Sequence, residues 1–210
     1  MIRASYQFTR RMFIPSRNFV LLAGILLALS VQAKSLRELR IGGTEFGYRY
    51  SGGVDATVAG NDYDACYHGI YLGYRLPFRP FAKERARITW DSSVNISVLD
   101  SDNSPLSGNR MGIRTGVGFE YLIVQQWLVK LDLGMDFARV STTSSSGLAP
   151  KGSGWEFGGH IEGSILYSPH PRVTAFMGLG LETLGQQTFY DVELDAGASP
   201  TFSTGIFFPW

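Results

Sequence analysis

Most of the chain after residue 33 alternates apolar and polar side chains with a period of two, which is the spacing of a β-strand. The alternation is clearest in five segments, which span residues 88–98, 110–123, 127–137, 155–167 and 173–183. Three further segments follow it less regularly, at 39–50, 66–76 and 202–210. In the first of these the phase changes between Ile41 and Phe46, and we expect Gly42 and Gly43 to absorb the change as a β-bulge. The pattern predicts eight strands, with no convincing helical periodicity among them.

The connections between these segments fall into two alternating classes. The long, polar connections are expected at residues 52–65, 100–108, 141–153 and 185–198. The shorter ones are expected at residues 77–86, 124–126 and 168–171. Transmembrane barrels show this asymmetry, with long loops outside the cell and short turns in the periplasm. With an even strand count, both chain ends are expected on the periplasmic side.

The polar face of the strands combines charges of both signs with many of the 25 glycines. Glycines on a water-facing surface would serve no purpose, whereas inside a narrow cylinder they make room for long charged side chains. We therefore expect the apolar face to point outward to lipid and the following side chains to form a polar network in the bore: Arg110, Arg114, Glu120, Lys130, Asp132, Asp136, Glu156, His160 and Glu162. Hairpin geometry is expected to place Asp132 near Glu162, and Arg114 near Asp132 and Asp136.

Aromatic residues, 13% of the chain, gather at the ends of the apolar faces. Transmembrane barrels carry aromatic girdles at both membrane interfaces, separated by about ten residues along a strand. The residues expected in such girdles are Tyr48, Tyr121, Trp127, Phe137, Trp155 and Tyr167.

Residues 1–33 differ from the remainder. Arginines without acids precede the apolar run 19–29, and small residues follow, which is the pattern of a secretory signal peptide. A membrane-spanning helix needs about 20 apolar residues, so an uncleaved anchor is the less favoured alternative. Arg10 and Arg11 also resemble a twin-arginine export motif, although we interpret them as part of an ordinary basic leader. We expect two parts, a signal peptide at 1–33 and a barrel at 34–210.

Cleavage would remove four of the 19 Lys and Arg residues but none of the 18 Asp and Glu residues. The mature chain would then be acidic without a basic patch, so no nucleic-acid partner is expected.

The last segment alternates apolar side chains up to the chain end, at Phe202, Ile206, Phe208 and Trp210. This end resembles the carboxy-terminal signature that the bacterial outer-membrane assembly machinery recognises, although most members end in Phe, and Pro209 is also a departure. Together with the leader and the strand count, the chain resembles the small eight-stranded outer-membrane barrels, such as the OmpA transmembrane domain, OmpX and the opacity-like proteins. The resemblance implies an all-β, transmembrane, antiparallel up-and-down barrel of eight strands in the Gram-negative outer membrane. A soluble periplasmic β-protein is the alternative.

The resemblance also implies partners, namely the barrel assembly machinery, outer-membrane lipid and lipopolysaccharide, and it allows for an extracellular ligand held by the loops. Eight strands enclose a bore just wide enough for side chains. We therefore expect a bore plugged by charged side chains and a non-enzymatic structural or surface-interaction role, with no catalytic residues. One alternative is a narrow channel or a conduit for small hydrophobic molecules. Another is a lipid A-modifying hydrolase using His160, Glu162 and Ser164, which alternate along one strand face.

No cofactor or metal centre is expected. Cys66 is the single cysteine, which excludes an intramolecular disulfide, and His68 and His170 lack metal-ligand spacing with nearby residues. The expected outer loops are rich in acids, which suggests the hypothesis that they bind divalent cations bridging to lipopolysaccharide phosphates.

Overall fold

The computed structural model describes residues 42–210, except 59, 79, 82–84, 102–105, 125, 145–151, 184, 190–191 and 196. The signal peptide expected at residues 1–33 lies outside the described residues. In the described part, the regular elements are all β-strands. No helix in this part is long and apolar enough to cross a membrane.

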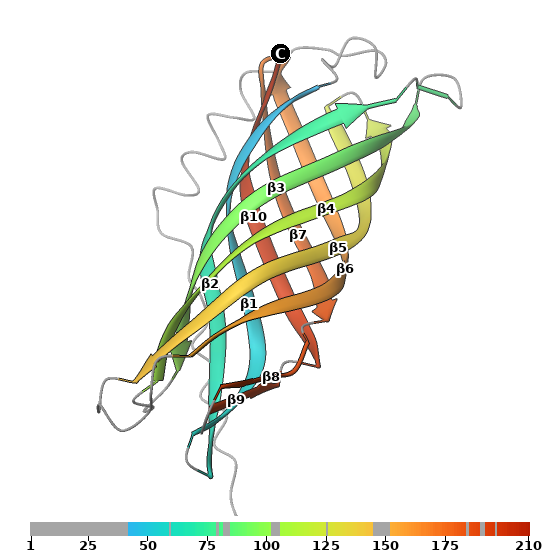
Figure 1. Cartoon of the computed structure of the whole chain (residues 1–210). Coiled ribbons are helices and arrows are strands. Elements are labelled where there is room, and N and C mark those ends of the chain that lie inside the picture. The colour runs from blue at the N-terminus through green and yellow to red at the C-terminus, as the bar shows by residue number, and fades with distance from the viewer. Residues whose placement is uncertain are drawn as a thin grey trace, which may run out of the picture.

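Eight long strands form the wall of a barrel: β1 (Gly43–Val58), β2 (Asn61–Pro77), β3 (Ala86–Ser101), β4 (Leu106–Val124), β5 (Trp127–Ser144), β6 (Gly152–His170), β7 (Val173–Thr183) and β10 (Ala198–Pro209). In the chain, a short hairpin of β8 (Gln187–Phe189) and β9 (Val192–Asp195) follows β7 and precedes β10. Its strand β9 pairs with β1. Consecutive wall strands are antiparallel, and β10 pairs with β1 from Gly43↔Pro209 to Ser51↔Thr201 (Figure 1). The sheet therefore closes on itself, and the predicted eight-stranded antiparallel barrel is confirmed.

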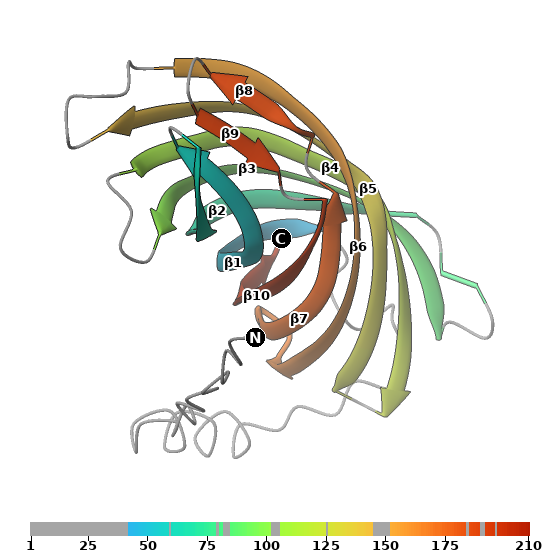
Figure 2. The same cartoon turned by 90° about the horizontal axis from the view of Figure 1, so that it is seen from below.

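The barrel has two different ends. The terminal end carries the start of β1, the end of β10 and the connections β2–β3, β4–β5 and β6–β7, and is uppermost in Figure 1. The distal end carries the other connections and the β8–β9 hairpin, and Figure 2 views the barrel from that end.

The distal connections are shorter than the sequence predicted, because the strands extend into them. The segment expected as a loop at 52–65 consists almost entirely of the last part of β1 and the first part of β2. Strands β1–β6 have 16 to 19 residues. A bilayer is crossed by about 9–11 strand residues, so these strands are long enough to continue well beyond one.

The bulge in β1 lies elsewhere than predicted. β1 begins at Gly43, and its pairing with β2 shifts between Ser51 and Val54, where Gly53 adopts a φ of 70°. The expected bulge at Gly42 and Gly43 is therefore wrong. The extra residue reverses the alternation, because Ser51 before it and Val54 after it are both buried. A one-residue shift moves side chains to the opposite face of a strand.

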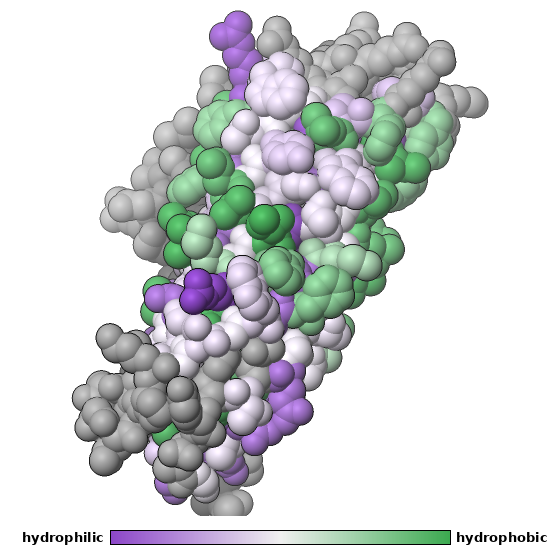
Figure 3. All heavy atoms as spheres, viewed as in Figure 1, coloured by the Kyte–Doolittle hydropathy of each residue, from purple (hydrophilic) through white to green (hydrophobic). Residues whose placement is uncertain are grey.

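The wall is apolar outside and charged inside. Outward side chains such as Leu179 and Met135 are 68% and 59% exposed, whereas Glu120 and Glu182 in the interior are 0% and 1% exposed. Figure 3 shows hydrophobic side chains over the middle and upper parts of the visible face, with hydrophilic ones in its lower half and at its upper tip. This distribution is the reverse of a water-soluble barrel and suits a lipid-facing belt.

Two apolar clusters also lie among the buried residues. The distal cluster contains Val54, Ala56, Val58, Ala65, Tyr67, Leu99, Leu106, Val140, Val192 and Leu194. The second, here the terminal cluster, contains Tyr71, Leu122, Leu128, Leu166, Phe176 and Phe207. The ionic side chains occupy the interior between and beside them.

Candidate functional site in the barrel interior

The interior of the described barrel holds charged side chains from seven of the eight wall strands. The basic ones are Arg49, Arg75, Arg87, Arg110, Arg114 and Lys130. The acidic ones are Glu45, Asp91, Glu120, Asp132, Asp136, Glu156, Glu162 and Glu182. Strand alternation directs each of them inward, so the interior is an ionic network built from residues distant in sequence.

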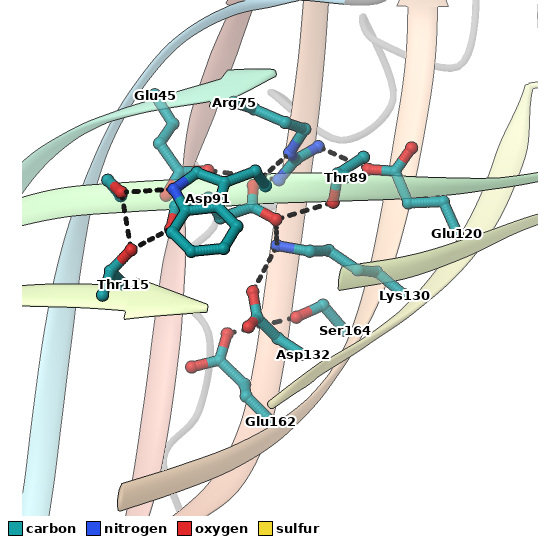
Figure 4. Close-up of polar contacts among 12 residues, drawn as sticks. Glu45, Arg75, Thr89, Asp91, Thr115, Glu120, Lys130, Asp132, Glu162 and Ser164 are labelled. Carbon is teal, nitrogen blue, oxygen red and sulfur yellow. Dashed lines mark hydrogen bonds and ion pairs between the residues drawn. The ribbon is translucent and has the colours of Figure 1, made fainter. Parts of the chain in front are cut away.

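Arg75 is the centre of the network near the terminal end (Figure 4). Its guanidinium donates from Nε to Asp91 Oδ1 at 2.8 Å, from Nη1 to Glu120 Oε1 at 2.8 Å, and from Nη2 to Glu45 Oε2 at 3.2 Å. The other carboxylate oxygen of Glu120 accepts from Arg87 Nε at 2.5 Å. One cation thereby links β2 to β1, β3 and β4.

His160 and Lys130 hold the carboxylates in the middle of the bore. Lys130 Nζ lies 2.6 Å from Asp132 Oδ2 and 3.1 Å from Asp91 Oδ2. The two ring nitrogens of His160 lie 2.9 Å from Asp136 Oδ2 and 3.5 Å from Asp132 Oδ1. His160 therefore bridges two acids of β5 from its position on β6.

Arg110 and Arg114 link the strands on the distal side of this layer. Arg110 Nε donates to Glu156 Oε2 at 2.7 Å. Arg114 contacts Asp136 at 2.9 Å, Glu162 at 3.4 Å and Glu182 at 3.5 Å.

Hydroxyl groups of β1 and β10 complete this part of the network. The Ser51 hydroxyl donates to Glu182, and Ser203 Oγ donates to Glu162 Oε1 at 2.7 Å. The network thus reaches around the whole circumference.

Glycine makes this crowding possible, as the sequence suggested. A Cβ atom on Gly134 would lie 2.6 Å from His160 Cε1 and 2.2 Å from the Thr115 carbonyl oxygen. A Cβ atom on Gly118 would lie 2.6 Å from Lys130 Cε. Such separations are far below van der Waals contact. A residue larger than glycine at either position would therefore clash with the atoms around it, which include the charged side chains.

Little space remains between the charged groups. A cavity of about 30 Å³ lies among Glu45, Arg49, Tyr71, Arg114 and their neighbours. It has room for about one or two water molecules. Beyond it, the distal cluster fills the bore with apolar side chains, of which Ala56 and Val140 are 0% exposed.

The structure brings the predicted network residues together in this interior. All nine are buried, Asp132 pairs with Glu162 in register, and Arg114 pairs with Asp136. Glu45 belongs to the network but was not predicted from the sequence, because it lies in the segment in which the phase of the apolar–polar alternation was ambiguous. The distal cluster was not predicted either. The alternation of Val54, Ala56 and Val58 with Asp55 and Thr57 could have indicated it.

The residues expected in aromatic girdles line the outside of the wall. Tyr48, Tyr121, Trp127, Phe137 and Trp155 are exposed, and Tyr167 is half-buried against Trp127 with ring centroids 4.6 Å apart. Ile206, Phe208 and Trp210 of the expected assembly signal are also exposed, and Phe202 is half-buried.

The hydrolase alternative requires Ser164 beside His160, and the geometry does not place them so. Ser164 Oγ donates to Glu162 Oε1 at 3.1 Å, whereas His160 contacts Asp132 and Asp136. Within the described residues, no group of three or more His, Cys, Asp or Glu side chains is placed to hold a metal ion.

A closed eight-stranded antiparallel barrel with a lipid-compatible exterior is the architecture of the small outer-membrane β-barrel proteins. Neisserial surface protein A has a similar structure, with a TM-score of 0.54, 13% identity, and coverage of 80% of this chain and 97% of that one. Ail of Yersinia pestis has a TM-score of 0.43 and 13% identity, covering 80% of this chain and 99% of Ail. OprG of Pseudomonas aeruginosa has a TM-score of 0.47 and 7% identity, covering 86% and 97%. At such identities, the similarity to Neisserial surface protein A concerns the fold alone.

No family model matches the chain by sequence, and no curated protein matches it.

Proposed function

We propose that this chain is a non-enzymatic barrel of the Gram-negative outer membrane, closed to ions, with a structural or surface-interaction role. The observation that carries the proposal is the filled interior. Ion pairs occupy its middle, and the distal cluster seals one end with apolar side chains. A hydrated ion could pass only by displacing the ion pairs and the apolar cluster. Separating a buried ion pair and disrupting close apolar packing both cost free energy.

The terminal end is proposed to face the periplasm and the distal end the exterior. The β4–β5 and β6–β7 turns at the terminal end are short and the β7–β10 connection at the distal end is long, which supports this orientation, because transmembrane barrels keep their short turns in the periplasm. Residues 1–33 would direct export, and the outward side chains of Phe202, Ile206, Phe208 and Trp210 would present the last strand to the assembly machinery. Outer-membrane lipid, lipopolysaccharide and an extracellular ligand at the distal end would be the partners.

Planar-bilayer recording tests the closed bore. The purified mature barrel, inserted into a bilayer, is expected to give no reproducible stepwise conductance, while a general porin in the same apparatus gives open channels. Uniform openings that scale with the number of inserted barrels would contradict the proposal.

A conduit for small hydrophobic molecules is the second candidate, and one feature of the wall favours it. β7 ends at Thr183, which pairs with Gly159, so β7 does not continue along the part of β6 that lies beyond that pair. Gly154 in this part pairs with Val140 of the distal cluster. An apolar interior beside a part of the wall that β7 does not cover is what a lateral route needs.

Titration with a hydrophobic fluorescent dye separates the two candidates. The closed barrel is expected to show only the unsaturable partitioning seen with its detergent. Saturable binding of one dye per barrel would favour the conduit.

A further inference from the structure

The outward face of β4, β5 and β6 changes from apolar to polar over three successive rows of paired residues. From the middle of the wall towards the distal end, the rows are Ile113–Phe137–Phe157, Met111–Arg139–Trp155 and Asn109–Ser141–Ser153. A lipid-facing surface passes from hydrocarbon to headgroups in this order, with tryptophan at the boundary. Arg139 therefore lies in the boundary row.

The side chains around Arg139 are arranged as hydrogen-bond donors above an aromatic surface. Trp155 stacks on Phe137 with ring centroids 4.8 Å apart and an interplanar angle of 11°. Arg139 Nη2 donates to Ser153 Oγ at 3.4 Å, and Ser141 Oγ donates to Asn109 Oδ1 at 2.5 Å. The second of these bonds uses the amide oxygen of Asn109, so the NH₂ group of this exposed side chain is not engaged by it.

Charge distinguishes this place from the surrounding surface. Arg139 is exposed and forms no ion pair with a described carboxylate. The other described side chains of fixed charge that point outward at the distal end are all acidic, namely Asp55, Asp62, Asp64, Asp100, Glu193 and Asp195. An anion that approaches the outer face at this end therefore meets one guanidinium, whose planar N–H groups match the oxygens of a phosphate.

We propose that Arg139, with Asn109 and Ser153, binds a phosphate group of a phosphorylated glycolipid in the outer leaflet. The acyl chains of that lipid would lie against the apolar row of Phe137 and Phe157. The proposal rests on the proposed function, because it requires the distal end to reach the outer leaflet. Placement at the boundary also suits an arginine, since a lipid-facing arginine costs far less near the interface than at the bilayer midplane.

The test is native mass spectrometry of the full mature barrel, released from detergent micelles that contain a lipid of stated structure. The lipids are lipid A with both phosphates, the same lipid with its phosphates removed, and phosphatidylglycerol, with inorganic phosphate as a soluble competitor. The variants are R139Q, R139K and a matched control, R172Q, which removes an exposed arginine from the β6–β7 turn at the opposite end.

Phosphorylated lipid A is expected to bind R139Q about tenfold more weakly than wild type, the loss of roughly one charge-assisted contact. R139K keeps the charge but not the planar donors, so its affinity should lie between those of R139Q and wild type. The affinity of R172Q should equal that of wild type. The site would be overturned if R139Q bound phosphorylated lipid A as tightly as wild type does, or if R172Q lost as much affinity as R139Q. It would also be overturned if wild type bound dephosphorylated lipid A as tightly as the phosphorylated form. Equal affinity for phosphatidylglycerol, or full competition by inorganic phosphate, would overturn its assignment to a glycolipid. Heat-modifiable gel migration of each protein checks the fold, and its absence in wild type would contradict the proposed function instead.

Discussion

At the scale of single residues, the barrel depends on carboxylates that neutralise more than one cation. Glu120 is 0% exposed and accepts hydrogen bonds from both Arg75 and Arg87. Removing one member of such a group leaves buried charge without compensation, which costs far more than the intact group contributes.

Glu120→Gln tests this dependence, because it keeps the shape of the side chain and removes its charge. We expect the free energy of unfolding to fall by about 3–5 kcal/mol, measured by urea unfolding in lipid vesicles. The matched control is Glu193→Gln, the same change on an exposed side chain, which should stay within about 0.5 kcal/mol of wild type. Equal stability of the two variants would show that the pairs near the terminal end contribute nothing.

Two glycines on neighbouring strands should respond oppositely to alanine. On Gly134 the new methyl group would lie 2.2 Å from the Thr115 carbonyl oxygen, whereas on the outward-facing Gly163 the nearest atom would be 3.9 Å away. Gly134→Ala is expected to destabilise by about 1–3 kcal/mol. Gly163→Ala should be neutral or slightly stabilising, because glycine weakens a strand. The same unfolding assay reports both, and a tolerated Gly134→Ala would mean that the interior is less crowded than described.

At the scale of elements, the bulge at Gly53 decides what each part of β1 faces. Before it the strand directs Glu45 and Arg49 inward, and after it Val54 and Ala56. One inserted residue thus lets one strand serve both the ionic interior and the apolar distal cluster.

Gly53→Val should disfavour the bulge, because a β-branched residue is strained at a φ of 70°. A regular strand with the same number of residues would point Asp55 and Thr57 into the distal cluster, and burying an unpaired carboxylate there is costly. We expect proteinase K to cleave the distal part of β1 or β2 in the Gly53→Val variant, while heat-modifiable migration of the barrel persists. Gly53→Asn is the control, because asparagine tolerates the positive φ at this position. If Gly53→Val resists protease as Gly53→Asn does, the bulge does not determine the phase.

Alternation in the sequence was sufficient to predict the strands and the polar residues of the bore, because a buried charge and a lipid-facing apolar residue leave a strong period of two. The prediction failed where the side of the strand that carries the apolar residues changes within one strand. The distal half of β1 has its apolar side chains inside, so its pattern resembled a polar loop. Glu45 was missed for a related reason, since its strand shows too few clear alternations before the bulge to settle the phase.

At the scale of the whole molecule, the four tryptophans report which side of the wall faces lipid. Trp90, Trp127, Trp155 and Trp210 are 40%, 42%, 62% and 64% exposed, and all lie on the outward face. We expect phospholipids with brominated acyl chains to quench their fluorescence strongly and aqueous iodide to quench it weakly.

Single replacements locate that quenching within the wall. Trp90 lies inside the apolar belt on β3 and Trp155 at its boundary, so Trp90→Phe should remove more of the lipid-quenched signal than Trp155→Phe. Stronger quenching by iodide than by brominated lipid would mean that the apolar face is covered by something other than a bilayer.

In the proposed orientation, the strands that continue past the apolar belt have a consequence for encounters outside the cell. Much of the distal surface is paired sheet, in which Asp195, Asp55 and Asp64 stand side by side on three neighbouring strands. A molecule that meets this surface finds side chains already held in a fixed order, so association would sacrifice little backbone freedom on the side of the barrel. Recognition there would favour partners whose own shape and charge match a rigid template over partners that depend on a loop wrapping around them.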